Sequence, residues 1–258
     1  MGKRVNVIEQ YIFAIRQINY KEYKNQTNEM NLGWLWDYLN PLIYMIIMST
    51  YYQNIIVKKI ENFPVFVFIG ITIFNYYQSA TNGAMRSIVS NKQLLIKSQM
   101  PVEIYIYQKI IMAARTMFFS FVMLIPIIMF FKIRLTWRVV QIIPIFLLTT
   151  IIIIGISKIL AVLYVYFEDI GYLYSVFMTL MVFVSCVFVP LEKVPDNIRT
   201  LFQYNPIYIS ISMVRDCLMY GTVSHISYWV KITSWAVLLL LVGNKFFKVN
   251  KNKFVNLI

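Results

Sequence analysis

Long uninterrupted runs of apolar residues dominate the pattern of this chain. An α-helix needs about 20 predominantly apolar residues to cross the roughly 30 Å hydrocarbon layer of a bilayer. We predict membrane-spanning helices at residues 36–57, 64–82, 108–131, 139–164, 173–189 and 228–247. The runs do not show the strict alternation of a membrane β-strand. The expected fold is therefore an all-α integral membrane protein with six transmembrane helices.

The first residues follow a different pattern. Between residues 5 and 20, apolar positions such as Val5, Ile8 and Ile12 share one wide arc of a helix, while Glu9 and Arg16 lie opposite. Such a helix lies in the membrane interface, or docks on a soluble partner, and both can hold. We expect a cytoplasmic amphipathic interface segment at 1–30 and a six-span transmembrane domain at 31–258.

The ends of the chain are expected on the cytoplasmic side of the cell membrane. Polar residues interrupt residues 5–20, so no cleavable signal peptide is expected. Basic residues are more numerous in the segments that would share the N-terminus's side of the membrane than in the segments on the opposite side. This bias favours a cytoplasmic N-terminus. Six spans then return the C-terminus to the cytoplasm.

Two connections between predicted spans are long. Residues 83–107 would be cytoplasmic, and residues 190–227 external. The external connection is partly apolar and is punctuated by Pro190, Pro195 and Pro206. Non-helical backbone at membrane depth must be shielded by protein or water. We therefore predict short helices that form a re-entrant external segment between spans five and six.

Composition and charge agree with a membrane location. The chain is 59% hydrophobic, with a mean hydropathy of +0.65 and a formal net charge of +13. On a soluble protein this charge would suggest nucleic acid as a partner. Here the basic residues lie mostly between apolar runs, so membrane lipids with anionic headgroups are the simpler partner. An anionic substrate is a second reading.

The sequence shows no pattern typical of an enzyme. It contains no GxxxxGK[ST], HExxH or GxSxG motif, and its single histidine, His225, has no second histidine at metal-ligand spacing. Cys186 and Cys217 are too far apart for a CxxC site and are interpreted as buried spectators. We expect a transport subunit that binds no cofactor or metal, with the energy for transport coming from another subunit.

Polar residues recur at helical spacing in the first two predicted spans. Steps of three or four place such residues on one face of a helix, and polar groups in a span usually face other helices or water. The functional interpretation is the wall of a substrate channel, with aromatic rings for sugar faces and amides for hydroxyls; the alternative is hydrogen bonding between helices. The residues are Asp37, Asn40, Tyr44, Met48 and Tyr51 in the first span and Asn75, Gln78, Ser79, Asn82 and Arg86 in the second.

Two basic residues fall inside predicted spans. Arg115 lies well inside the third span and is a candidate contact for an anionic group of the substrate. The alternative is that Arg115 pairs with a carboxylate such as Glu103 or with backbone carbonyls. Lys158, near the inner end of span four, is expected to snorkel to the interface.

The cytoplasmic connection carries a candidate coupling element. An apolar core of three residues is flanked by lysines and is followed by Met100 and Pro101. Such a helix can insert its apolar side chains into a groove on a soluble partner, or it can simply lie at the interface. The candidate coupling residues are Lys92, Leu94, Leu95, Ile96, Lys97, Met100 and Glu103.

Several short motifs, in order along nearly the whole chain, resemble the polysaccharide and teichoic-acid branch of the type-2 ABC exporter permeases. They include the Leu-Gly-Trp-Leu-Trp sequence at 32–36 with Asn40-Pro41, the 70–77 segment, the loop at 91–103, the Phe-Glu-Asp-Ile sequence at 167–170 and the Tyr-Asn-Pro sequence at 204–206 with Arg215 and Gly221. Departures from the family pattern occur at residues 29–31, where basic residues are usual, at Glu168, where arginine is common, and at Val189-Pro190.

The resemblance implies a specific assembly. The permease would form a homodimer with two copies of a separate ABC ATPase, which would bind ATP and Mg²⁺. A lipid-linked glycan or a polyol-phosphate polymer such as teichoic acid would pass through a channel at the dimer interface. The helix at 5–20 and the loop at 91–103 would contact the ATPase.

Two other functions remain open at this point. The same architecture could export drugs, lipids or peptides, which would call for a larger apolar binding surface. A protein of another class, a non-transporting scaffold of glycan assembly, would need no ATPase. A membrane-bound transferase would show clustered histidines or carboxylates at one membrane face, and only Glu168 and Asp169 come close.

Overall fold

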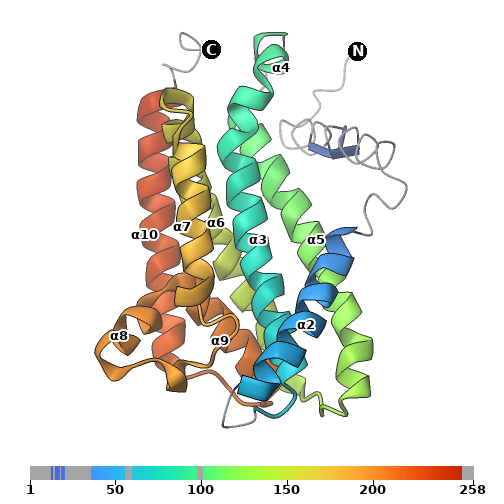
Figure 1. The fold of residues 1–258 in the computed structure, drawn as a ribbon. Coiled ribbons are helices and arrows are strands. Elements are labelled where there is room, and N and C mark those ends of the chain that lie inside the picture. The colour runs from blue at the N-terminus through green and yellow to red at the C-terminus, as the bar shows by residue number, and fades with distance from the viewer. Residues whose placement is uncertain are drawn as a thin grey trace.

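The computed structural model is a bundle of long helices (Figure 1). It describes residues 13, 15–17, 19–20, 36–55, 60–97 and 101–251, and within these ranges it contains helices and no strand, which confirms the all-α prediction. The helices are α2 (Trp36–Ile55), α3 (Phe63–Ser90), α4 (Lys92–Lys97), α5 (Glu103–Phe130), η2 (Trp137–Gln141), α6 (Ile142–Tyr166), α7 (Ile170–Val184), η3 (Leu191–Lys193), α8 (Asp196–Tyr204), α9 (Pro206–Leu218) and α10 (Ile226–Asn250).

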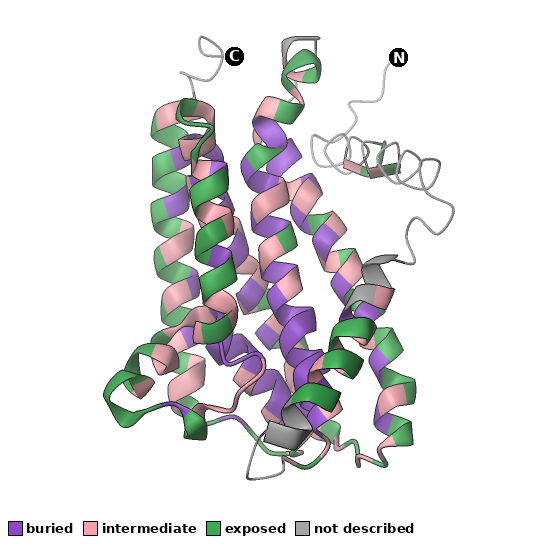
Figure 2. Cartoon of the chain, in the orientation of Figure 1, coloured by how far each residue is buried: buried purple, intermediate pink, exposed green. Residues whose placement is uncertain are grey.

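Helix α3 is the centre of the bundle. It packs against α2, α5, α6, α7 and α9, and 78% of its most apolar stretch is buried inside the chain. Figure 2 shows the lower half of α3 as mostly purple and its upper half as a mixture of purple, pink and green. Its fully buried aromatic residues include Phe68, Tyr76 and Tyr77. The surrounding helices are more exposed, as expected of helices whose outer faces contact lipid.

Four helical segments in the described part of the chain are long and apolar enough to cross a membrane. They are α3, α5, the continuous Trp137–Tyr166 segment and α10. The other two predicted spans are helical but shorter in their apolar part: Pro41–Tyr51 within α2, and α7. Four of the six predicted spans are therefore candidate spans by length and composition, and the six-span count stays a prediction.

Three helices differ most from their predicted bounds: α3 and α5 are longer than predicted, and α7 ends earlier. Helices α3 and α5 both continue beyond their predicted apolar ranges, and together with α4 they make most of the predicted 83–107 connection helical. Helix α7 ends at Val184, earlier than the predicted Val189. The chain turns there because Cys186 adopts a left-handed conformation with φ of 51°, and its amide donates to the Phe183 carbonyl.

The bundle has two distinct ends (Figure 1). Helix α4, the turn between α6 and α7, and the last residues of α10 lie at one end, which we call the α4 end. Helices α8 and α9 and the turn after α5 lie at the other end, which we call the α8 end. The predicted short helices of the 190–227 connection are confirmed as η3, α8 and α9.

Most of the predicted interface segment at 1–30 lies outside the described residues. The described positions 13, 15–17, 19 and 20 are helical, and Phe13 and Tyr20 are exposed. One contact ties this region to the bundle, because the Gln108 side-chain amide donates to Asn19 Oδ1 at 2.9 Å. The division into segments 1–30 and 31–258 stays a prediction.

Candidate functional site

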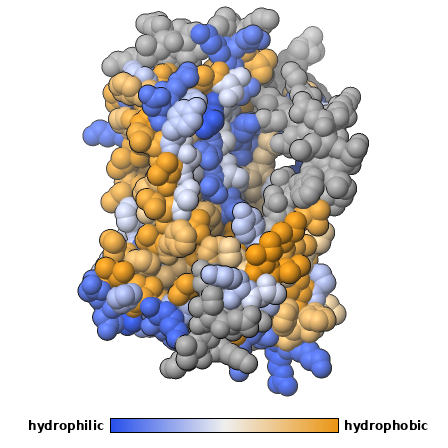
Figure 3. Space-filling view, in the orientation of Figure 1, coloured by the Kyte–Doolittle hydropathy of each residue, from blue (hydrophilic) through white to orange (hydrophobic). Residues whose placement is uncertain are grey.

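The polar stripe predicted on the second span exists as a continuous face of α3. Its residues Asn75, Gln78 and Asn82 are half-buried, while Ser79 and Arg86 are exposed. In Figure 3 a hydrophilic column runs along this face between two hydrophobic regions. Polar side chains through the apolar zone of a bundle must face water, protein or a polar ligand. The α3 face therefore supplies a polar path along an otherwise apolar molecule.

A groove between α3 and α5 contains most of this stripe. It has a volume of about 320 Å³ and is lined by Pro41, Thr72, Asn75, Tyr76, Gln78, Ser79, Asn82, Ala113, Thr116, Met117 and Ser120. The described lining residues offer amides, hydroxyls and one phenol, and none of them is charged. Such groups suit a neutral hydroxyl-rich ligand, because each can donate or accept hydrogen bonds.

Two buried oxygens make the groove a candidate binding site. Thr72 Oγ1 and Asn82 Oδ1 have no hydrogen-bond partner within the part of the chain that the structure describes. Buried polar atoms are usually paired, and an unpaired one costs about 1–3 kcal/mol. In contrast, Ser79 Oγ is satisfied locally by donating to the Asn75 carbonyl at 2.6 Å. The first two oxygens could bind hydroxyls of a ligand.

The structure does not bring the stripe of the first span into this groove. Tyr44 and Tyr51 are 50% and 61% exposed, Met48 is half-buried against the core, and of α2 only Pro41 lines the groove. Asp37 and Asn40 lie in the helical backbone of α2, but their side chains are outside the described part of the structure. The described residues of the first-span stripe, Tyr44, Met48 and Tyr51, thus lie outside this groove.

Arg115 also lies outside the groove, although its neighbours Ala113 and Thr116 line it. Its side chain is exposed on α5, with the guanidinium 5.7 Å from the centre of the Phe119 ring. Arg115 is 12 residues from Glu103 on the same helix, about 18 Å at 1.5 Å per residue, which is too far for an ion pair. The alternative pairing of these two residues is therefore wrong.

Lys158 behaves differently from the prediction. It is only 4% exposed and does not reach the interface. Its Nζ donates to Asn244 Oδ1 at 2.7 Å and lies 3.9 Å from Glu103 Oε2. The snorkelling prediction fails because α10 and α5 supply polar partners inside the bundle, which compensate the cost of burying the charge. The sequence showed that Lys158 is a charged residue within a span. It could not show the partners, because they come from distant segments of the chain.

The predicted coupling segment contains the expected short helix. Lys92, Leu94, Leu95, Ile96 and Lys97 all belong to α4, and Glu103 is the first residue of α5. Lys92 and Leu94 are exposed, and Leu95 packs partly against the core. The side chains of Ile96 and Lys97, and the whole of Met100, are outside the described part. The exposed apolar Leu94 fits a helix that offers its side chains to a partner.

Arg215 anchors the hairpin of α8 and α9 at the opposite end, and the sequence analysis assigned it no role. The side chain is 4% exposed, and its guanidinium donates to the carbonyls of Phe66, Cys186 and Val187 at 2.8–3.2 Å. It also lies 3.3 Å from the centre of the Phe66 ring. One side chain therefore ties α9 to α3 and to the turn after α7.

Neighbouring residues complete this anchor. Gly70 leaves the space for the guanidinium, because a Cβ there would lie 2.6 Å from Arg215 Nη2. Asn205 begins α9 by accepting from the Ile207 amide at 3.0 Å, and its own amide donates to Ser185 Oγ at 3.0 Å. Capping of a helix start by asparagine is a strong local preference. Backbone carbonyls at the end of α7 thus accept hydrogen bonds from side chains: Val184 from Asn205, and Cys186 from Arg215.

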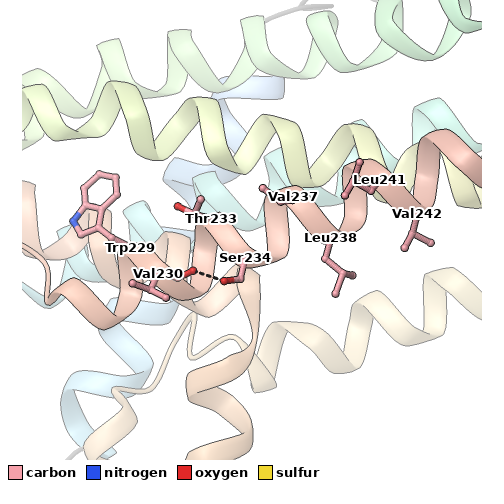
Figure 4. A pocket seen from close by; sticks show the side chains of 8 residues that line it. All are labelled: Trp229, Val230, Thr233, Ser234, Val237, Leu238, Leu241 and Val242. Atoms are coloured by element: carbon pink, nitrogen blue, oxygen red, sulfur yellow. Dashed lines mark hydrogen bonds between the residues drawn. The ribbon is translucent and has the colours of Figure 1, made fainter.

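The outer surface of α10 carries an apolar groove of a different character. Figure 4 shows its lining by Trp229, Val230, Thr233, Ser234, Val237, Leu238, Leu241 and Val242, all from α10. The polar Ser234 hydroxyl is satisfied by the Val230 carbonyl at 2.8 Å. An apolar exposed helix face with internally satisfied hydroxyls is typical of a surface that contacts lipid.

The described residues contain no group of three or more His, Cys, Asp or Glu side chains that could hold a metal ion. Cys186 and Cys217 are both buried free thiols. His225 begins α10, where its ring nitrogen accepts from the Ser227 amide at 3.2 Å.

Several long apolar helices, a polar path and short helices at one end define a multi-pass membrane permease. The model of the ABC-2 type transporter family matches residues 14–219. The chain belongs to this family.

Three curated relatives are similar to this chain over most of its length. The chain is 24% identical to the O-antigen export system permease protein RfbA of Klebsiella pneumoniae over 93% of both chains. It is 23% identical to RfbA of Myxococcus xanthus over 98% of both. The polysialic acid transport protein KpsM of Escherichia coli is 22% identical over 82% of this chain and 83% of KpsM.

Proposed function

We propose that this chain is the membrane permease subunit of an ABC exporter that moves a lipid-linked polysaccharide across the cytoplasmic membrane. The observation that carries this proposal is the uncharged, hydroxyl- and amide-lined groove between α3 and α5, in a chain similar throughout to O-antigen export permeases. A polyol-phosphate polymer such as teichoic acid is a related cargo. Its phosphates would need cations, and Arg86 and Arg115 are the nearest candidates along the sequence.

The proposed topology has six spans with both ends in the cytoplasm. Helices α2 and α7 would complete the four apolar spans, with the α4 end inside and the α8 end outside. Helices α8 and α9 would then form a re-entrant hairpin. Support comes from α9, whose residues Ile209, Ile211 and Met213 are fully buried against the bundle. A purely extramembrane connection would not need such an apolar helix within the bundle.

The proposed assembly is a homodimer with two copies of a separate ATPase that binds ATP and Mg²⁺. The exposed aromatic stripe of α2, with Tyr44 and Tyr51, would face the channel between two copies. There it would complement the polar face of α3, with rings against sugar faces and amides on hydroxyls. Helix α4 would contact the ATPase. ATP-driven displacement of α4 would shift the channel between two states that bind the polymer differently.

Depletion of the protein in its native cell tests the proposal. The lipid-linked polymer on the cytoplasmic face and the surface glycan are measured together. We expect finished polymer to accumulate inside while the surface glycan is lost. An intact surface glycan without accumulation would contradict polysaccharide export and would favour an exporter of drugs, lipids or peptides, or a glycan-assembly scaffold.

A further inference from the structure

A buried charged cluster lies at the α4 end, apart from the groove. Lys158 of α6 is its centre, with Asn244 of α10 at 2.7 Å and the Glu103 carboxylate of α5 at 3.9 Å. The rings of Tyr107 and Phe247 lie 5.2 and 5.8 Å from the ammonium. Burying a lysine in this way is costly unless its charge is compensated. A purely structural role would be served better by an apolar residue, so the cluster calls for an explanation.

The cluster joins the candidate coupling segment to the rest of the bundle. Glu103 is the first residue of α5 and follows the segment that contains α4. A displacement of α4 therefore reaches Glu103 through a few residues of backbone. The negative charge at the first turn of α5 is also favourable for the helix itself.

Lys158 lies on α6, which is packed closely against α10. Helices α6 and α10 approach closely at Gly155 and Gly243, where a Cβ on either glycine would overlap backbone of the other helix. Lys158 lies one turn after Gly155, and Asn244 directly follows Gly243. The hydrogen bond between them is thus part of the same close contact. Packed interfaces of this kind move as units and do not deform continuously.

The two contacts of the ammonium differ in kind. The bond to Asn244 is short, whereas the distance to Glu103 is near the upper limit of an ion pair. The Glu103 side chain is 34% exposed and the Lys158 side chain 5%. Glu103 can therefore separate and be solvated, while Lys158 stays attached to the α6–α10 pair.

We propose that Glu103, Lys158 and Asn244 form the link that passes movement of the coupling segment to the α6–α10 pair. The three are positioning residues, and the inference rests on the proposed function because it requires an ATPase at α4. When α4 is displaced, Glu103 moves relative to Lys158, and the change in their attraction favours one position of the α6–α10 pair over the other.

Variants of the pair test this link in a strain whose only copy of the gene is the variant. Surface polymer, membrane level of the permease, and ATPase activity of the co-purified complex are measured for Glu103→Gln. We expect unchanged membrane level and ATPase activity, with polymer exported per ATP hydrolysed reduced about tenfold, a typical coupling effect. The reversed pair, Glu103→Lys with Lys158→Glu, is expected to restore export, because the Asn244 amide can also donate to a carboxylate.

Glu168→Gln is the matched control, since Glu168 is an exposed carboxylate in the turn between α6 and α7 at the same end. It is expected to export as the wild type does. Normal coupling in Glu103→Gln would overturn the inference alone. A fall in membrane level that accounts for the whole loss of export would also overturn it, because the pair would then be structural. Absence of polymer export by the wild type would overturn the proposed function and this inference together.

Discussion

Arg215 shows how one side chain stabilises the α8 end of the molecule. Its guanidinium contacts carbonyls of α3 and of the turn after α7, which lie 149 and 28–29 residues away in sequence. A planar fork with several donors fits this arrangement, and a lysine ammonium cannot reproduce it. Each buried carbonyl that loses its donor costs about 1–3 kcal/mol.

We therefore expect Arg215→Lys to destabilise the protein by about 1–3 kcal/mol, because at least one buried carbonyl loses its donor. The midpoint of thermal unfolding in detergent measures the effect. Arg199→Lys is the control, because Arg199 lies on the more exposed α8, with a side chain 35% exposed that pairs with Asp196. Equal midpoints for the two variants would show that the Arg215 contacts contribute little.

Asn82 lines the groove between α3 and α5. Replacing Asn82 by leucine removes an amide with an unpaired oxygen and leaves a side chain of similar size. Loss of one hydrogen bond to cargo, at about 0.5–1.5 kcal/mol, predicts an export rate about two- to tenfold lower at unchanged membrane level. Surface polymer per permease measures this. Ser234→Ala, on the exposed apolar face of α10, should export normally, and similar behaviour of both variants would contradict a substrate role for the groove.

At the scale of elements, the α6–α10 pair depends on two glycines. A Cβ on Gly243 would overlap the Gly155 carbonyl oxygen, so the helices must separate to accept a side chain. Forced separation of packed helices costs typically about 1–3 kcal/mol. Small residues at crossings of membrane helices allow this kind of close approach.

Gly243→Ala should therefore lower the yield of folded permease and its thermal unfolding midpoint. Gly83→Ala is the matched control, because a Cβ there would meet Lys109 side-chain carbons at an ordinary 3.4–3.6 Å. A helix also favours alanine over glycine by about 1 kcal/mol, so the control should be neutral or stabilising. An unchanged midpoint in Gly243→Ala would contradict the close crossing.

Periodicity and apolar length predicted the elements well but not their mutual contacts. The α3 stripe was correct because a step of three or four residues fixes a helix face without reference to other helices. Which helix covers that face depends on tertiary packing, and so the α5 side of the groove, with Thr116 and Ser120, was not predicted. For the same reason the sequence could not show that Lys158 has partners on α5 and α10.

The end of span five was also missed because it depends on contacts from a later segment. Val187, Phe188 and Val189 continue the apolar run, so hydropathy extends the helix through them. The helix ends earlier because Arg215 and Asn205 provide donors for carbonyls of this turn. Only a contact from a later segment makes the turn favourable at an apolar position.

At the scale of the whole molecule, the two ends differ in chemistry. The α4 end contains the coupling segment and the Lys158 cluster, and the α8 end contains the hairpin held by Arg215. The proposed topology assigns these ends to opposite sides of the membrane. An odd number of spans between α4 and α8 is required for this, namely α5, α6 and α7.

Cysteines introduced at the two ends test this topology. Gln93 of α4 and Asn197 of α8 are both exposed, whereas Cys186 and Cys217 are buried. In wall-free cells a membrane-impermeant thiol reagent should label Asn197→Cys at once and Gln93→Cys only after permeabilisation. Labelling of both positions in intact cells would contradict the crossing of α7.

The central claim is ATP-driven export of a polysaccharide, and transport into inverted membrane vesicles measures it most directly. Vesicles are prepared from native cells whose polymer is radiolabelled through its sugars, with and without this chain, and ATP is added outside. We expect ATP-dependent transfer of the labelled polymer into the lumen, where added glycosidase cannot reach it, only when the chain is present. Equal protection in vesicles that lack the chain, or transfer without ATP, would contradict it.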